Sequence, residues 1–271
     1  MKAKKSLHVD MKESTTWLRH GNNSPQDEAV MCYLQDRNVF FGESRGVCTY
    51  CKERARSVDH LATQCDRMMD YDYTWRHNEV VRSIHLGFCT KYGIKRCRRL
   101  RSHRVESTVE NSRVCIRTDT PIVTSTGVRA NRPDIVVHDK VRNEITIVEV
   151  GITSQNNLQE VEIEKTRKYG LLAGELAHMY KCKVDIIPYV MTWEGVVTKH
   201  HRKYRKALGI ERHVEAYIQS QVLKRTFVSA IASLQPVATG IGMCRRDAVR
   251  VEAAKLHDRC EAHQKTLESR A

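Results

Sequence analysis

Two carboxylates stand in the sequence where the apolar pattern predicts buried positions. Asp134 follows Pro133 and precedes the apolar run 135–137, and Glu149 lies inside a second apolar run, 145–152. Two short β-branched runs joined by a polar turn are typical of a β-hairpin. We therefore expect Asp134 and Glu149 to lie on adjacent strands, with their carboxylates sharing one site. Each feature alone is commonplace, because a strand glutamate often faces solvent.

A lysine on the following predicted helix completes this set. Lys165 falls in a series of positions seven residues apart, the others being Leu158, Leu172 and Met179, which predicts an amphipathic helix with Lys165 on its inward face. A buried lysine is costly unless it is paired, so we expect the carboxylates to be its partner. Two adjacent carboxylates also call for a cation between them. Hard oxygen ligands suit Mg²⁺ or Mn²⁺, and the combination predicts a metal-dependent catalytic site.

A second set of potential ligands lies upstream, with the spacing of a zinc site. Cys48 and Cys51 fit one tight turn, and His60 and Cys65 fit one turn of helix. Four protein ligands leave no open position for water, so the expected zinc is structural. The alternative is coincidence, because the chain has 10 cysteines. Since no secretory signal is visible, these cysteines favour thiols and metal ligands over a disulfide framework.

The chain is strongly basic, with 271 residues, a formal net charge of +14 and a pI near 9.4. This balance predicts a polyanionic partner, most simply nucleic acid. No apolar run approaches the length of a membrane span, so we expect no membrane partner. The basic segment 91–104 is either a solvated loop or, as we favour, a phosphate-binding segment. The residues that we expect to contact DNA are Arg76, His77, Asn78, Lys95, Arg96, Arg98, Arg99, Arg101 and Arg132.

Other segments give weaker predictions. Residues 1–23 indicate a frayed polar lead-in, and Ser24 followed by Pro25 predicts a helix that ends near Asn38. A strand is expected at 183–190, parallel to the Glu149 strand. Glu79 is interpreted either as an extra acidic group at the site or as part of a solvated helix face. His85 is interpreted as a lone structural histidine.

These predictions give an α/β fold with a mixed central sheet flanked by helices, a small zinc knuckle and helical extensions. We expect four parts. They are a helical lead-in (1–47), a CCHC zinc knuckle (48–75), a core that carries the carboxylates and Lys165 (76–210) and a charged, mainly helical C-terminal extension (211–271).

An Asp-then-Glu pair on a hairpin, with a lysine from the next element, resembles the PD-(D/E)XK restriction-like nuclease superfamily. With the upstream knuckle, the tripeptide RHN at 76–78 and RPD at 132–134, the chain is similar to the C-terminal endonuclease module of site-specific non-LTR retrotransposons. The similarity runs from about Trp17 to Ile210. One departure is Gly151, which stands where the simplest superfamily pattern has its lysine. The retrotransposon branch is similar in taking the lysine from the following helix.

The resemblance implies a restriction-endonuclease-like core that nicks target DNA, so that the exposed 3′-hydroxyl primes reverse transcription. Asp134 and Glu149 would hold Mg²⁺ or Mn²⁺, and Lys165 would orient or help to deprotonate the attacking water. Lys168 is the alternate lysine, and Tyr169 either contacts the water or substrate or simply packs. Zinc would hold the knuckle in shape.

The resemblance also implies target DNA, element RNA and an upstream reverse transcriptase domain as partners, and a nuclear location. The chain has no Tyr-x-Asp-Asp motif of a polymerase, so we expect a fragment, a truncated copy or a separately encoded nuclease. Two other classes stay open. One is a stand-alone, structure-selective nuclease similar to a junction resolvase, and the other is a zinc-dependent DNA-binding protein whose catalytic site has decayed.

Overall fold

The computed structural model describes residues 8–36, 46–68, 72–94 and 100–232. Its centre is a five-stranded mixed sheet in the order β1-β2-β3-β4-β5. Strands β1 to β4 pair antiparallel, whereas β5 pairs parallel to β4. The predicted hairpin and the predicted parallel strand are both confirmed. The strand bounds are β1 (Thr108–Glu110), β2 (Val114–Thr118), β3 (Ile135–Asp139), β4 (Glu144–Thr153) and β5 (Lys183–Thr192).

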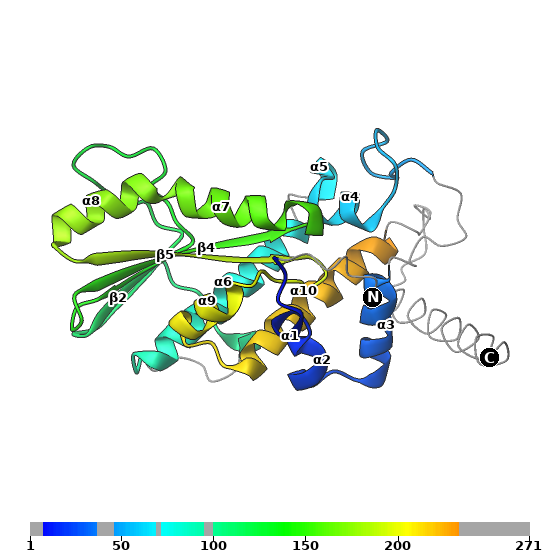
Figure 1. Cartoon of the computed structure of the whole chain (residues 1–271), viewed down its shortest axis with the longest axis horizontal. Helices are drawn as coiled ribbons and strands as arrows, with labels where there is room; N and C mark the ends of the chain where they lie inside the picture. The colour runs from blue at the N-terminus through cyan, green and yellow to red at the C-terminus, as the bar shows by residue number, and fades with distance from the viewer. Residues whose placement is uncertain (1–7, 37–45, 69–71, 95–99, 233–271) are drawn as a thin grey trace.

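Helices cover both faces of this sheet (Figure 1). Helices α7 and α8 lie along one face, and α6, α9 and α10 lie on the other. Two short helices, α4 and α5, belong to the segment in which the zinc knuckle is expected. The bounds are α4 (Val58–Thr63), α5 (Asp66–Met68), α6 (Thr74–Lys91), α7 (Leu158–Lys168), α8 (Gly170–Tyr180), α9 (His201–Leu208) and α10 (Arg212–Ala232).

Strand β4 shows how the sheet selects which side chains reach the site. Successive side chains of a strand point to opposite faces. Val148 and Val150 pack into the larger core with α6 and α10, while Ile145 and Ile147 pack into the smaller core with α8. Glu149 has the parity of Ile147 and therefore points toward the α7–α8 side.

The helix expected to continue from Leu158 to Met179 is divided in two at Tyr169. Tyr169 leaves helical geometry, with φ −104° and ψ 12°, and caps both α7 and α8. Its ring is buried, and its hydroxyl donates to the carbonyl oxygen of Arg132 at 2.9 Å. The inward stripe continues through Leu172 and Leu176, which are buried, and ends before Met179, which is 45 % exposed. One face of the sheet is thus covered by two consecutive helices instead of one (Figure 1).

The N-terminal region also differs from the expectation. The predicted cap of α3 is confirmed, because the hydroxyl of Ser24 accepts from the backbone N–H of Asp27 at 3.1 Å. Residues 11–20, however, are not a frayed lead-in. Trp17 is 1 % exposed, and its backbone N–H donates to the side chain of Gln219 at 3.0 Å. The bounds here are α1 (Met11–Ser14), α2 (Thr16–His20) and α3 (Pro25–Gln35).

Helix α10 occupies the place of the expected C-terminal extension. Its buried apolar side chains share the main core with residues on the other side of the boundary expected after residue 210; they are Ile218, Val222, Leu223, Phe227 and Ala230. Residues 233–271 lie outside the described part of the chain. Over the described residues, none of the helices combines the length and apolarity that crossing a bilayer requires.

Candidate functional site

The strand register brings the two predicted carboxylates together. Strands β3 and β4 pair Ile135 with Val148, so Asp134 and Glu149 are the next pair beyond the end of β3. The backbone N–H of Asp134 donates to Glu149 Oε2 at 3.4 Å. Asp134 Oδ2 in turn accepts from the backbone N–H of Val150 at 2.7 Å. Both carboxylates are thus held at one end of the hairpin.

Two lysines from α7 reach one of these carboxylates. The Nζ atoms of Lys165 and Lys168 each lie 2.9 Å from Glu149 Oε1. Glu149 is 2 % exposed, so its charge needs such partners. The side chain of Lys165 is 19 % exposed and that of Lys168 is 42 % exposed. Both lysines considered from the sequence therefore contact the site, with Lys165 the more enclosed.

The ammonium of Lys168 also lies against an aromatic ring. It sits 4.8 Å from the centre of the Tyr169 ring. Burial works to lower the pKa of Lys168, but its hydrogen bonds to Tyr169 and Glu149 outweigh burial and raise the pKa. Burial raises the pKa of Tyr169 to about 12. Tyr169 therefore stays a neutral phenol near pH 7, which favours positioning and packing over proton transfer.

His77 is a partner of the site that the sequence did not predict. Its Nε2 atom lies 3.1 Å from Asp134 Oδ2. Burial lowers the pKa of His77, but the hydrogen bond and charge of Asp134 outweigh burial and raise it. In the same way, burial raises the pKa of Asp134, and the hydrogen bond and charge of His77 bring it below its usual value. The sequence placed His77 among DNA contacts, and its strand partner could not be read from local spacing.

A cavity of about 680 Å³ opens beside this pair. Helix α6 forms one wall, and the end of β2 and the approach to β3 form another. Asp134 lies in its lining, and so do two charged residues of the walls, Arg132 and Asp119, whose side chains pair at 2.8 Å. The full lining is Trp75, His77, Asn78, Glu79, Val81, Arg82, Val105, Ser107, Thr118, Asp119, Arg132 and Asp134.

Glu79 lies in the cavity wall and is not part of a solvated helix face. It is 5 % exposed, forms an ion pair with Arg82 and accepts from the hydroxyl of Tyr217 at 2.9 Å. The contact with Tyr217 ties α6 to α10. Glu79 thus contributes a carboxylate to the cavity while being held by two neighbours.

The predicted DNA contacts fall into three groups. His77, Asn78 and Arg132 line the cavity. Arg76 does not, because it is 1 % exposed and donates to the carbonyl oxygen of Ala62, and burial lowers its pKa to about 10. Arg76 therefore joins α6 to α4 instead of facing a ligand. Lys95, Arg96, Arg98 and Arg99 lie outside the described residues, and of Arg101 only the backbone is described.

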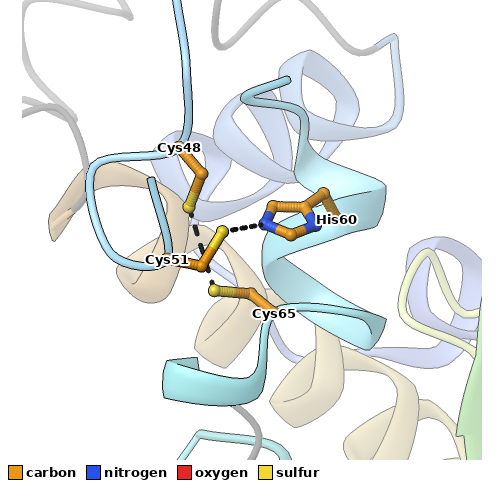
Figure 2. Close-up of side chains that lie close together, drawn as sticks. All are labelled: Cys48, Cys51, His60 and Cys65. Carbon is orange, nitrogen blue, oxygen red and sulfur yellow. Dashed lines mark hydrogen bonds between the residues drawn. The ribbon is translucent and has the colours of Figure 1, made fainter. Parts of the chain in front are cut away.

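The predicted zinc ligands converge (Figure 2). A tight turn, closed by hydrogen bonds from Cys48 N–H to the Arg54 carbonyl and from Lys52 N–H to the Cys48 carbonyl, presents Cys48 and Cys51. Helix α4 begins at a Ser57 cap, whose hydroxyl accepts from His60 N–H at 3.1 Å. The ring of His60 points toward Cys51, and Cys65 follows directly after the helix.

The distances among these ligands fit tetrahedral coordination. Cys48 and Cys65 Sγ are 3.8 Å apart, and Cys51 Sγ lies 3.3 Å from His60 Nε2. Zn–S and Zn–N bonds of about 2.3 and 2.0 Å give about 3.8 Å between sulfurs and about 3.5 Å between sulfur and nitrogen. Burial raises the pKa of Cys65 to about 11, so a buried thiolate there calls for a cation. The four side chains could hold a metal ion such as zinc.

A second convergence of potential ligands among the described residues is His85, Cys89 and His103. Neither group includes Asp134 or Glu149, which meet as a pair of carboxylates. Comparisons with known protein families and with curated proteins find no match for this chain.

Proposed function

We propose that this protein is a metal-dependent DNA endonuclease with a restriction-endonuclease-like core. The observation that carries the proposal is the meeting of Asp134, Glu149 and Lys165 at one end of a hairpin, beside a polar cavity. A carboxylate pair, an ammonium and room for a substrate are the parts that hydrolysis of a phosphodiester needs. The mixed sheet with helices on both faces is consistent with that core.

The carboxylate pair fits a hard divalent cation. Mg²⁺ is commonly held by one or two protein carboxylates, with waters and substrate phosphate completing its shell. In the structure the two carboxylates pair with three cationic or protonatable groups, His77, Lys165 and Lys168. When bound there, Mg²⁺ would polarise the scissile phosphate and lower the pKa of a bound water.

The lysines act on charge and position. Lys165, the more enclosed of the two, would orient the attacking water and offset negative charge that develops on the phosphate. Lys168 keeps Glu149 neutralised when Lys165 turns to its substrate, because both ammonium groups contact the same oxygen. His77 positions Asp134 from the opposite side.

The basic balance of the chain supports DNA as the substrate. Its net charge of +14 suits a polyanion, and the side chain of Arg132 is 57 % exposed in the cavity lining. The zinc knuckle and the RHN tripeptide beside the core support the more specific proposal of a non-LTR retrotransposon nuclease. Its nick would supply the 3′-hydroxyl for target-primed reverse transcription in the nucleus, with element RNA and a reverse transcriptase domain as partners.

Nicking of supercoiled plasmid, with Mg²⁺ added or omitted, tests this proposal. We expect Mg²⁺-dependent nicking that Asp134→Asn strongly lowers, because a metal ligand is lost, while DNA binding persists. Asp119→Asn is the matched control, because the side chain of Asp119 lines the same cavity and pairs with Arg132, while its hydrogen bond to the Asp134 carbonyl comes from the backbone N–H, which the substitution keeps. Its φ of 49° is one that asparagine tolerates.

Equal nicking by wild type and Asp134→Asn would overturn the assigned site, and DNA binding without nicking would favour the DNA-binding alternative. A four-way junction supplies a third arm. Marked preference for the junction over linear duplex would favour a structure-selective nuclease similar to a junction resolvase over a retrotransposon nuclease. The proposed hydrolysis of a phosphodiester would be the same in both.

A further inference from the structure

Three buried side chains outside the nuclease site gather between α6 and the segment before β1. His85 and Cys89 are 0 % exposed and His103 is 3 % exposed. His85 Nδ1 lies 2.7 Å from His103 Nε2 and 3.6 Å from Cys89 Sγ. The potential ligand atoms of the three residues all lie within 4.8 Å of one another.

Local structure explains why these residues meet. His85 and Cys89 are four residues apart on α6, so both side chains lie on one face, one turn apart. A short 3₁₀ helix, η3 (Leu100–Ser102), turns the chain back, and the backbone N–H of His103 donates to the carbonyl of Leu100 at 3.2 Å. The histidine that looked solitary in the sequence therefore has two potential co-ligands.

We propose that His85, Cys89 and His103 form a second zinc site. One thiolate and two imidazoles are a donor set that suits Zn²⁺ and is poorly suited to Mg²⁺. Tetrahedral zinc places sulfur and nitrogen about 3.5 Å apart and two nitrogens about 3.3 Å apart. The sulfur–nitrogen distance already fits, and the two rings need to separate by about 0.6 Å to admit the ion. The competing explanation is a metal-free N–H···N hydrogen bond between the rings.

The burial of the ligands makes this a structural site. Three protein ligands leave a fourth position for a water or another donor, but the enclosure of the ligands keeps a substrate away from it. The inference is independent of the proposed nuclease activity, because it rests on these three residues alone.

The position of the cluster indicates what a bound ion would do for the structure. Helix α6 carries His77 and Asn78 of one cavity wall, and Val105 and Ser107, which follow His103, belong to the lining as well. A metal ion joining α6 to His103 would therefore fasten two parts of the cavity wall together. It would also fasten both ends of the basic stretch that the sequence places between Cys89 and His103.

The test is the zinc content of the full chain, purified without chelators and measured by inductively coupled plasma mass spectrometry. We expect two zinc ions per wild-type chain and one in Cys89→Ser and His103→Gln, with Cys65→Ser losing the knuckle ion. The matched controls are Cys115→Ser, a buried cysteine outside both clusters, and His178→Gln, an exposed histidine of α8. Both controls should keep two ions.

Folded Cys89→Ser and His103→Gln proteins that keep the wild-type zinc content would overturn the proposal, and so would copper or iron in place of zinc. X-ray absorption of the wild type decides the matter if the variants fail to fold. The knuckle alone gives three sulfur ligands per zinc, whereas both sites together lower the average to two. A measured value of three would overturn the second site.

Discussion

Replacing Glu149 with glutamine should destabilise the protein more than replacing Lys165 with methionine. Glu149 accepts from two ammonium groups through one oxygen, so Glu149→Gln leaves both without their anion. Removing one partner of a buried pair costs about 3–5 kcal/mol. Because the side chain of Lys168 is 42 % exposed and can turn to solvent, we expect the lower end, about 3 kcal/mol.

Lys165→Met is expected to cost less for a definite reason. Methionine keeps the length and apolar stem of the side chain, and Glu149 retains Lys168 and the backbone N–H of Asp134. We expect a loss of about 1 kcal/mol. The double variant Glu149→Gln/Lys165→Met should be more stable than Glu149→Gln alone, because the more enclosed of the two unpaired ammonium groups is gone.

Urea unfolding at neutral pH, followed by circular dichroism without added Mg²⁺ or chelator, measures these differences. Chelators are omitted because they would remove a metal ion held by the cluster of Cys48, Cys51, His60 and Cys65. The reasoning is refuted if Lys165→Met costs as much as Glu149→Gln, or if the double variant shows the sum of the two single effects.

Two further predictions concern stability. Gly151→Ala should lower the free energy of unfolding by about 1–2 kcal/mol, because a Cβ there would lie 3.3 Å from side-chain atoms of Val161 and Val190. Thermal denaturation measures the change, and Gly174→Ala on α8 is the control, because a Cβ there meets nothing within 4 Å and should not destabilise the protein. An unchanged melting temperature for Gly151→Ala would contradict the packing argument. Burial raises the pKa of Glu215, but the charge and hydrogen bond of His201 outweigh burial and lower it below 4.5. This carboxylate therefore stabilises the fold above pH 4.5 and loses that effect as the pH falls through its folded-state pKa. In Glu215→Gln the urea concentration at the unfolding midpoint should fall less between pH 7 and pH 3 than in the wild type. An equal fall in both proteins would assign acid unfolding to other groups.

The parts of the site that the sequence predicted depend on short-range rules. Alternation along a strand and the polar turn between two apolar runs sufficed to place Asp134 opposite Glu149. Helical periodicity placed Lys165 toward them, and ligand spacing placed the four knuckle residues together. These patterns are local, and each has few competing structures.

The parts that the sequence did not predict depend on contacts between distant segments. Nothing beside Arg76 in the sequence indicates that Ala62 will accept its guanidinium, and nothing beside His77 indicates Asp134. The break at Tyr169 was hidden because the series of apolar residues continues across it, although Gly170 directly after it is a weak local indication. His103 was missed because its ligand partners lie on another element.

The packing of α2 against α10 has a consequence for the order of folding. The backbone N–H of Trp17 donates to the side chain of Gln219. The core that contains Trp17 and residues of α10 also contains residues of the sheet, which lie between Trp17 and α10 in the sequence. Contacts over such separations require large loops to close, which slows folding. During synthesis the core that α2 belongs to cannot be completed until α10 has been made. A chain that stopped at Ile210 would expose the apolar surface that α10 covers. Residues 76–210 would therefore be an incomplete folding unit without α10.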